Sequence, residues 1–129
     1  MKNDDIVKVF TDSVGRTNSI CSLVKSMEPS SLNPELRLRV LGIIEFRFKD
    51  TNPHDITFAM YQDYFSAVWV LGGLTYWERK KCACAHIADR VISGEVLQEK
   101  DVEPAQLRNC FSDLVELAKT AINYPVSVH

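Results

Sequence analysis

The sequence predicts an all-α fold, a single-domain bundle of about five helices that occupies residues 1–129. Capping residues and helix-ending glycines or prolines bracket most of the chain, and apolar residues recur at the three- and four-residue spacing of a helix. The chain offers few segments that could pair into a sheet. A length of 129 residues is enough to bury about two-thirds of the unfolded surface in one core.

The N-terminal part of the chain is expected to be helical on both sides of a break. Apolar residues from Ile6 to Val24 form a helical stripe, and residues 15–19 interrupt it. This pattern predicts either one helix or two. The stretch EPSSLN, residues 28–33, is then typical of a loop.

The segment Leu36–Lys49 carries two competing signals. Its apolar and charged residues alternate, which favours a strand or a hairpin. Against this, Asn33 and Pro34 form a helix-start signal, and the segment is long for one strand. We therefore interpret it as a helix that is exposed to solvent on two sides, in which the aliphatic parts of the arginine side chains cover apolar surface. A strand or hairpin is the alternative.

Three further helices are predicted from their end signals. Asn52 and Pro53 start the first, which should be the buried central helix because it is apolar almost all round. Thr75 opens a capping box for the second, and Pro125 ends the third. The predicted ranges are Pro53–Leu71, Tyr76–Ser93 and Pro104–Ile122.

The stretch KKCACAHIADR, residues 80–90, contains two cysteines, a histidine and an aspartate. On a strand, Cys82, Cys84 and His86 would share one face and could bind a metal, but on the predicted helix Cys84 lies on the opposite side. A zinc site needs four ligands, and no other part of the chain has matching spacing. A cysteine nucleophile in the middle of a helix would also lack oxyanion donors. We therefore expect no metal, no cofactor and no catalytic residue.

Composition and charge bear on the compartment and on the class of partner. Fifteen Lys and Arg against seventeen Asp and Glu give a net charge of −2, which argues against direct nucleic-acid binding. The opening MKNDD does not resemble a secretory signal, and the nearly apolar run Tyr64–Trp77 is too short to span a membrane. We expect a soluble, cytoplasmic protein without membrane partners. Its four cysteines, Cys21, Cys82, Cys84 and Cys110, should then be reduced.

Arg79 and His86 carry a resemblance to a known family. An arginine and a histidine separated by six residues on one helical face are similar to the motif of the small all-helical HEPN ribonucleases. The resemblance implies that this pair would bind the scissile phosphate and assist proton transfer, usually across a dimer interface. Lys80 stands where that family prefers Asn, Asp or His. A metal-independent ribonuclease is therefore the alternative function.

The chain as a whole resembles, in type rather than by any motif, the small bacterial immunity proteins that neutralise toxins. The resemblance implies a binding protein rather than an enzyme, whose partner is a nuclease toxin with a basic cleft. The connector GEVLQEKDVE, residues 94–103, is the candidate binding segment because its charge is mostly negative, although acidic connectors are commonly solvated loops. The predicted partner-binding residues are Glu95, Glu99, Asp101 and Glu103.

Overall fold

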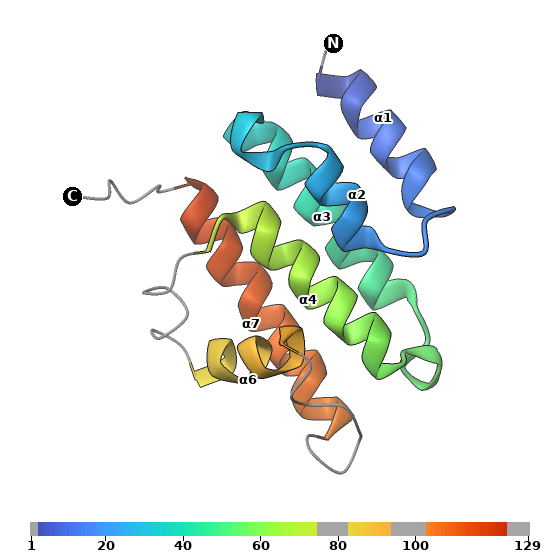
Figure 1. Ribbon diagram of the computed structural model, residues 1–129, viewed down its shortest axis with the longest axis vertical. Helices are drawn as coiled ribbons and strands as arrows, with labels where there is room; N and C mark the ends of the chain where they lie inside the picture. The colour runs from blue at the N-terminus through green and yellow to red at the C-terminus, as the bar shows by residue number, and fades with distance from the viewer. Residues whose placement is uncertain (1–2, 75–82, 94–102, 124–129) are drawn as a thin grey trace, which may run out of the picture.

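The described part of the chain is a bundle of α-helices. The computed structural model describes residues 3–74, 83–93 and 103–123, and this part contains no strand (Figure 1). The all-α prediction is therefore confirmed. The helices are α1 (Asn3–Val14), α2 (Ile20–Ser26), α3 (Pro34–Asp50), α4 (Phe58–Gly72), α6 (Ala83–Ile92) and α7 (Pro104–Asn123), with 3-10 turns at Pro29–Ser31 and Pro53–Asp55.

The N-terminal stripe forms two helices rather than one. The break predicted at residues 15–19 separates α1 from α2, and Ser19 caps the second helix by accepting a hydrogen bond from the Ser22 N–H at 3.1 Å. Both helices turn apolar residues inward, with Phe10 from α1 and Val24 from α2 almost fully buried.

The ambiguous segment is helical, so the strand or hairpin alternative is wrong. The Asn33 side chain accepts the Leu36 N–H at 2.8 Å, and Pro34 occupies the first turn of α3. A row of side chains four residues apart faces the core, which explains why the alternating pattern did not produce a strand. The buried residues of α3 are Leu36, Val40, Leu41, Ile44 and Phe48.

The central helix begins later than the sequence predicted. Asn52 does act as a cap, but its side chain accepts the His54 N–H at 3.0 Å and serves the 3-10 turn Pro53–Asp55. Helix α4 begins at Phe58, where Thr57 accepts the Met60 N–H at 3.2 Å. The predicted start at Pro53 was wrong because a cap followed by proline also suits a single turn.

Helix α4 is the centre of the bundle, as predicted. It packs against α2, α3, α6 and α7 (Figure 1), and eight of its residues are buried. Aromatic rings from three helices meet around it. Phe48 of α3 stacks on Phe111 of α7 with ring centroids 4.0 Å apart, and Tyr64 and Phe65 of α4 complete this cluster.

The last two helices agree with the predicted ranges where they can be compared. Helix α7 spans Pro104–Asn123, close to the predicted Pro104–Ile122. Helix α6 covers the second half of the predicted Tyr76–Ser93, and the first half lies outside the described residues. Within the three described ranges, no helix combines the length and the apolar character needed to cross a bilayer.

Candidate protein-binding surfaces

Most of the predicted acidic binding segment lies outside the described residues. This applies to Glu95, Glu99 and Asp101. Glu103 is described, and its side chain is exposed immediately before the first turn of α7. One of the four predicted residues can therefore be placed, at the N-terminal end of a helix.

The exposed side of α7 continues the negative charge. Glu103, Asp113 and Glu116 are all exposed; Asp113 and Glu116 are three residues apart and share one side of the helix, and Glu103 lies just before its first turn. We call these three residues the α7 acidic face. The sequence reasoning missed Asp113 and Glu116, although their three-residue spacing within the predicted helix Pro104–Ile122 would have shown that they are neighbours.

The one lysine on this side of α7 is already paired with carboxylates. Lys119 Nζ lies 3.1 Å from Glu116 Oε1 and 3.8 Å from Glu45 Oε1. The hydrogen bond to Glu116 is the main cause that raises the pKa of Lys119. One positive charge shared by two carboxylates leaves the α7 acidic face with an excess of negative charge.

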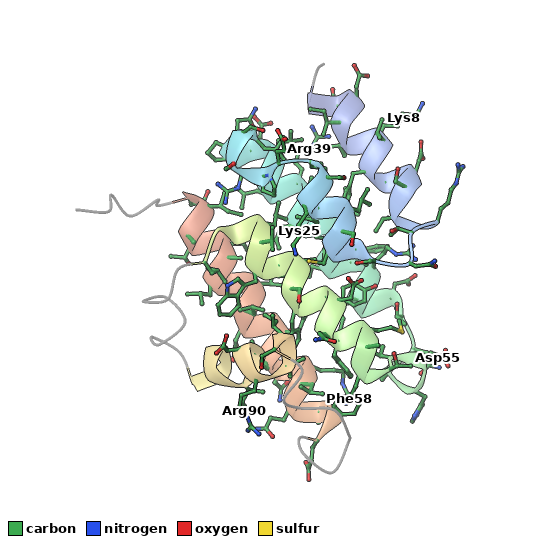
Figure 2. The ribbon with its side chains drawn as sticks, in the orientation of Figure 1. Lys8, Lys25, Arg39, Asp55, Phe58 and Arg90 are labelled. Carbon is green, nitrogen blue, oxygen red and sulfur yellow. The ribbon has the colours of Figure 1, made fainter. Side chains whose placement is uncertain are left out.

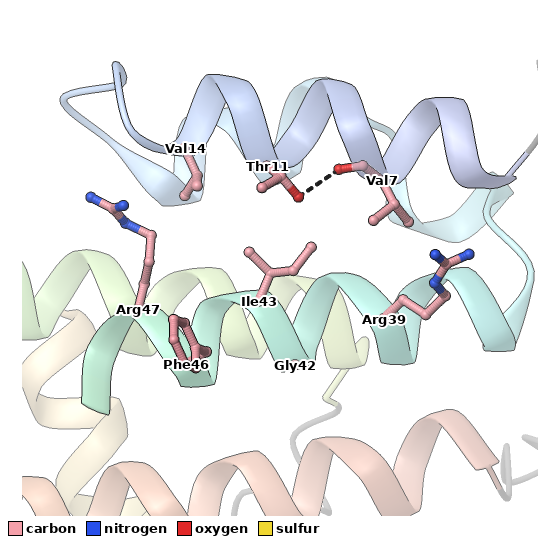
Figure 3. A pocket seen from close by; sticks show the side chains of 8 residues that line it. All are labelled: Val7, Thr11, Val14, Arg39, Gly42, Ile43, Phe46 and Arg47. Atoms are coloured by element: carbon pink, nitrogen blue, oxygen red, sulfur yellow. Dashed lines mark hydrogen bonds between the residues drawn. The ribbon is translucent and has the colours of Figure 1, made fainter. Parts of the chain in front are cut away.

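A second surface is a groove between α1 and α3 that holds about 460 Å³ (Figure 3). Val7, Thr11 and Val14 line it from α1, and α3 contributes the remaining lining residues, Arg39, Gly42, Ile43, Phe46 and Arg47. We call it the α1–α3 groove. Its middle is apolar, and an arginine stands at each end (Figure 3).

Two residues of α3 give the groove its shape and its apolar surface. Gly42 has no side chain, and a Cβ built there would meet no heavy atom within 4 Å. Phe46 is 69% exposed. Phe46 lies outside the buried series 36, 40, 44 and 48, and this mismatch with the core-facing row was the signal in the sequence that could have identified it.

The two arginines of the groove differ in their partners. Arg39 Nη1 lies 2.8 Å from Asp4 Oδ1 of α1. The guanidinium of Arg47 is exposed and has no partner among the described residues. The groove therefore presents one free positive charge and a second that a carboxylate already contacts.

A smaller hollow of about 130 Å³ lies on the other side of α1, where that helix faces α2. Val9, which is 56% exposed, lines it together with apolar residues of both helices. The lining contains no charged side chain. Helix α1 thus forms a ridge at the edge of the bundle, and Lys8 on its outer side points into solvent (Figure 2).

The structure does not place the residues of the ribonuclease and metal hypotheses. Arg79, Lys80 and Cys82 lie outside the described residues. Cys84 and His86 belong to α6, but their side chains are not described. Among the side chains that are described, no group of three or more His, Cys, Asp or Glu could hold a metal ion.

The expectation that all four cysteines are reduced is wrong for Cys110, which is disulfide-bonded and buried in α7. Neither spacing nor compartment arguments from the sequence revealed this bond. Cys21 is free and buried. Burial raises the pKa of the Cys21 thiol, which disfavours the thiolate that a nucleophile requires.

The large aromatic residues of α4 belong to the core. Tyr61, Tyr64 and Trp69 are all buried, so they are not available as interface anchors. The Tyr61 hydroxyl has no hydrogen-bond partner among the described atoms. Tyr76 and Trp77 lie outside the described residues.

Comparisons with known proteins give no relative from which a function could be transferred. No protein-family model matches the chain, and neither the curated proteins nor the solved structures contain a significant match. Function therefore has to be argued from the described surfaces.

Proposed function

We propose that this protein acts by binding another protein and inhibiting it, and that the partner is a nuclease toxin with a basic surface. The resemblance in type to bacterial immunity proteins motivates the proposal. The α7 acidic face is the observation that supports it best, because it extends the negative charge of the connector along a helix. A rigid helix positions charges more accurately than a loop does.

The expected contribution of this surface is mainly kinetic. Complementary charges steer two proteins together, and charges at the rim of an interface act chiefly on the association rate. A nuclease must hold a polyanionic substrate, so its cleft presents lysine and arginine. Glu103 and Asp113 have no ion-pair partner among the described residues, and they are therefore free to meet such a cleft.

The proposal predicts that a neighbouring gene encodes a nuclease toxin domain, and the test is a titration of the protein with that domain. The double variant Glu103→Lys and Asp113→Lys should lower the association rate at least about tenfold at low ionic strength, and the difference should shrink at high salt. The triple variant of the connector, Glu99→Lys, Asp101→Lys and Glu103→Lys, should act in the same direction.

The matched control is Asp5→Lys with Asp12→Lys. Both residues are exposed on α1, and the variant has the same change in net charge as the α7 double variant. It should bind the toxin domain as the wild type does. Equal loss in both double variants would mean that net charge alone governs binding. Undiminished binding by both the α7 double variant and the connector triple variant would refute the acidic interface.

A further inference from the structure

The α1–α3 groove leaves an aromatic side chain uncovered inside a hollow. Phe46 lines this groove, which holds about 460 Å³, and 69% of its surface is exposed. A single exposed apolar residue is ordinary on a protein surface. An exposed ring in an apolar hollow between two helices is a different feature, because a partner that fills the hollow also covers the ring. The groove therefore offers a partner both an apolar contact and a space to occupy.

Positive charge is the second property of the groove. Arg39 and Arg47 stand at its two ends, and its lining contains no acidic side chain (Figure 3). Arg47 is exposed and has no partner among the described residues. Arg39 Nη1 lies 2.8 Å from Asp4 Oδ1, but a guanidinium has five N–H donors and can bind a second carboxylate without losing the first. The complementary partner is therefore apolar in its middle and acidic at both ends.

The walls of the groove indicate that the partner segment is a helix. Both walls are α-helices, whose backbone groups are bonded within each helix. The hydroxyl of Thr11 is also used, since it donates to the carbonyl of Val7 at 2.8 Å (Figure 3). An extended peptide would find no strand edge there to pair with, whereas a helix satisfies its own backbone and needs only side-chain contacts.

The distance between the two arginines sets the spacing of the acids. At 1.5 Å of rise per residue, Arg39 and Arg47 are about 12 Å apart along α3. Two residues seven positions apart in a partner helix are about 10 Å apart on one side of it, and the residues three and four positions after the first lie between them. Flexible arginine side chains can absorb the difference. One helix face therefore presents carboxylates to both arginines and apolar side chains to Ile43 and Phe46.

We infer that the α1–α3 groove binds an amphipathic helix of a partner protein, on which two large apolar residues lie between two acidic residues seven positions apart. The apolar side chains cover Phe46, and the two carboxylates bind Arg39 and Arg47 through charge-assisted hydrogen bonds. A small amphiphile such as a fatty acid has a single carboxylate and would leave one arginine without an anion. The two charged ends of the groove therefore favour the helix.

This inference goes beyond the proposed function and does not rest on it. The proposed toxin surface is basic and meets the α7 acidic face, whereas the groove takes an acidic helix. Helix α1 packs on α2 and α3, and the acidic face lies on α7 (Figure 1). The α7 double variant Glu103→Lys and Asp113→Lys should therefore bind such a helix as the wild type does, and a failure of one proposal leaves the other standing.

The probe is a labelled, alanine-based helical peptide of about 18 residues whose centre reads Glu, two alanines, two leucines, two alanines and Glu. A second peptide has glutamine in place of both acids, and a third has lysine. Fluorescence anisotropy with the full chain should give a dissociation constant below about 0.1 mM for the acidic peptide, and binding at least about tenfold weaker for the lysine peptide. No binding of the acidic peptide up to about 1 mM, or equal binding of all three, would overturn the inference.

Variants of the groove test where the peptide binds. Phe46→Ser and Arg47→Glu should each weaken the acidic peptide at least about tenfold, and both side chains are exposed, so the fold should be kept. A peptide with lysine at one end should bind Arg47→Glu better than the acidic peptide does. Circular dichroism verifies that each variant is folded.

The matched control is Lys8→Glu, which has the same change in charge as Arg47→Glu and lies exposed on the outer side of α1 (Figure 2). It should bind the acidic peptide as the wild type does. Equal losses in Lys8→Glu and Arg47→Glu would mean that net charge alone attracts the peptide, which contradicts a site in the groove. Binding of dodecanoate by a protein that binds none of the peptides would assign the groove to a small amphiphile and also overturn the inference.

Discussion

The absence of a side chain at Gly72 sets how closely α4 and α7 approach. A Cβ at this position would lie 2.9 Å from the Cβ of Ala118 and 3.2 Å from its Cα. Gly42 of α3 is the opposite case, since a Cβ there would meet nothing within 4 Å. The two glycines lie in helices of the same protein, and they should respond to the same substitution with opposite signs.

We predict that Gly72→Ala lowers the free energy of unfolding by about 1–3 kcal/mol, because overpacking forces two helices apart. Gly42→Ala should raise it by about 0.5–1 kcal/mol, because alanine restricts the unfolded chain and favours a helix. Urea unfolding measures both. The double variant Gly72→Ala with Ala118→Gly should recover part of the loss, and an equal response at both glycines would contradict the close approach.

At the scale of elements, polar side chains of one helix donate hydrogen bonds to backbone carbonyl groups at the end of another helix. Gln62 of α4 donates to the carbonyl of Ile92 at the end of α6, at 2.9 Å. Arg37 of α3 donates through Nε and Nη2 to the carbonyl of Leu71 near the end of α4, at 3.0 and 2.7 Å. Burial lowers the pKa of Arg37, and its two hydrogen bonds compensate in part for this desolvation. These bonds satisfy carbonyl groups that a helix end leaves without partners.

Helix α2 depends most on such support because it is only seven residues long. The carboxylate of Asp63, in α4, accepts the N–H groups of Ile20 at 2.7 Å and Cys21 at 3.0 Å. It also accepts the Ser19 hydroxyl at 2.8 Å. A negative charge at the first turn complements the helix dipole as well.

We predict that Asp63→Ala lowers the free energy of unfolding by about 2–3 kcal/mol, because two part-buried N–H groups lose a charged acceptor. Asp63→Asn should cost less, since one acceptor oxygen remains. Asp113→Ala is the control, because Asp113 is exposed on α7 and should change stability by less than about 0.5 kcal/mol. Chemical unfolding measures the three variants, and a similar small effect at both aspartates would argue against the long-range cap.

The sequence predicted the start of a helix correctly where the capping residue directly precedes that helix in the chain. Asn33 with Pro34 marks the true start of α3, and the pattern of α7 was predicted to within a residue. The start of α4 was missed because the cap at Asn52 belongs to a separate turn. Contacts such as the one from Asp63 to α2 join residues more than forty positions apart, and no local pattern reports them.

At the scale of the whole molecule, the two candidate surfaces differ in how far the sequence reveals them. Asp113 and Glu116 of the α7 acidic face are three residues apart in a helix that the sequence predicts, so sequence reasoning could have paired them. The α1–α3 groove needs two helices placed side by side. Residues such as Val7 and Phe46 are more than thirty positions apart in the chain, and only the fold shows that they line one groove.

The disulfide of Cys110 bears on the whole molecule because it constrains the chain from inside α7. It also predicts a stability that depends on redox state. A cross-link removes conformational freedom from the unfolded chain, which is typically worth about 2–4 kcal/mol.

We therefore predict that a reducing agent lowers the free energy of unfolding of the wild type by about 2–4 kcal/mol. Cys110→Ala should have a lower stability that no longer responds to the reductant. Cys21→Ala is the matched control: Cys21 is also buried but free, so this variant should keep the full response to reduction whatever its own stability. Unfolding curves with and without reductant, with thiol titration under denaturing conditions, measure the effect. A wild type whose thiols are released by the reductant at unchanged stability would contradict the prediction, because the cross-link would then not restrict the unfolded chain enough to affect stability.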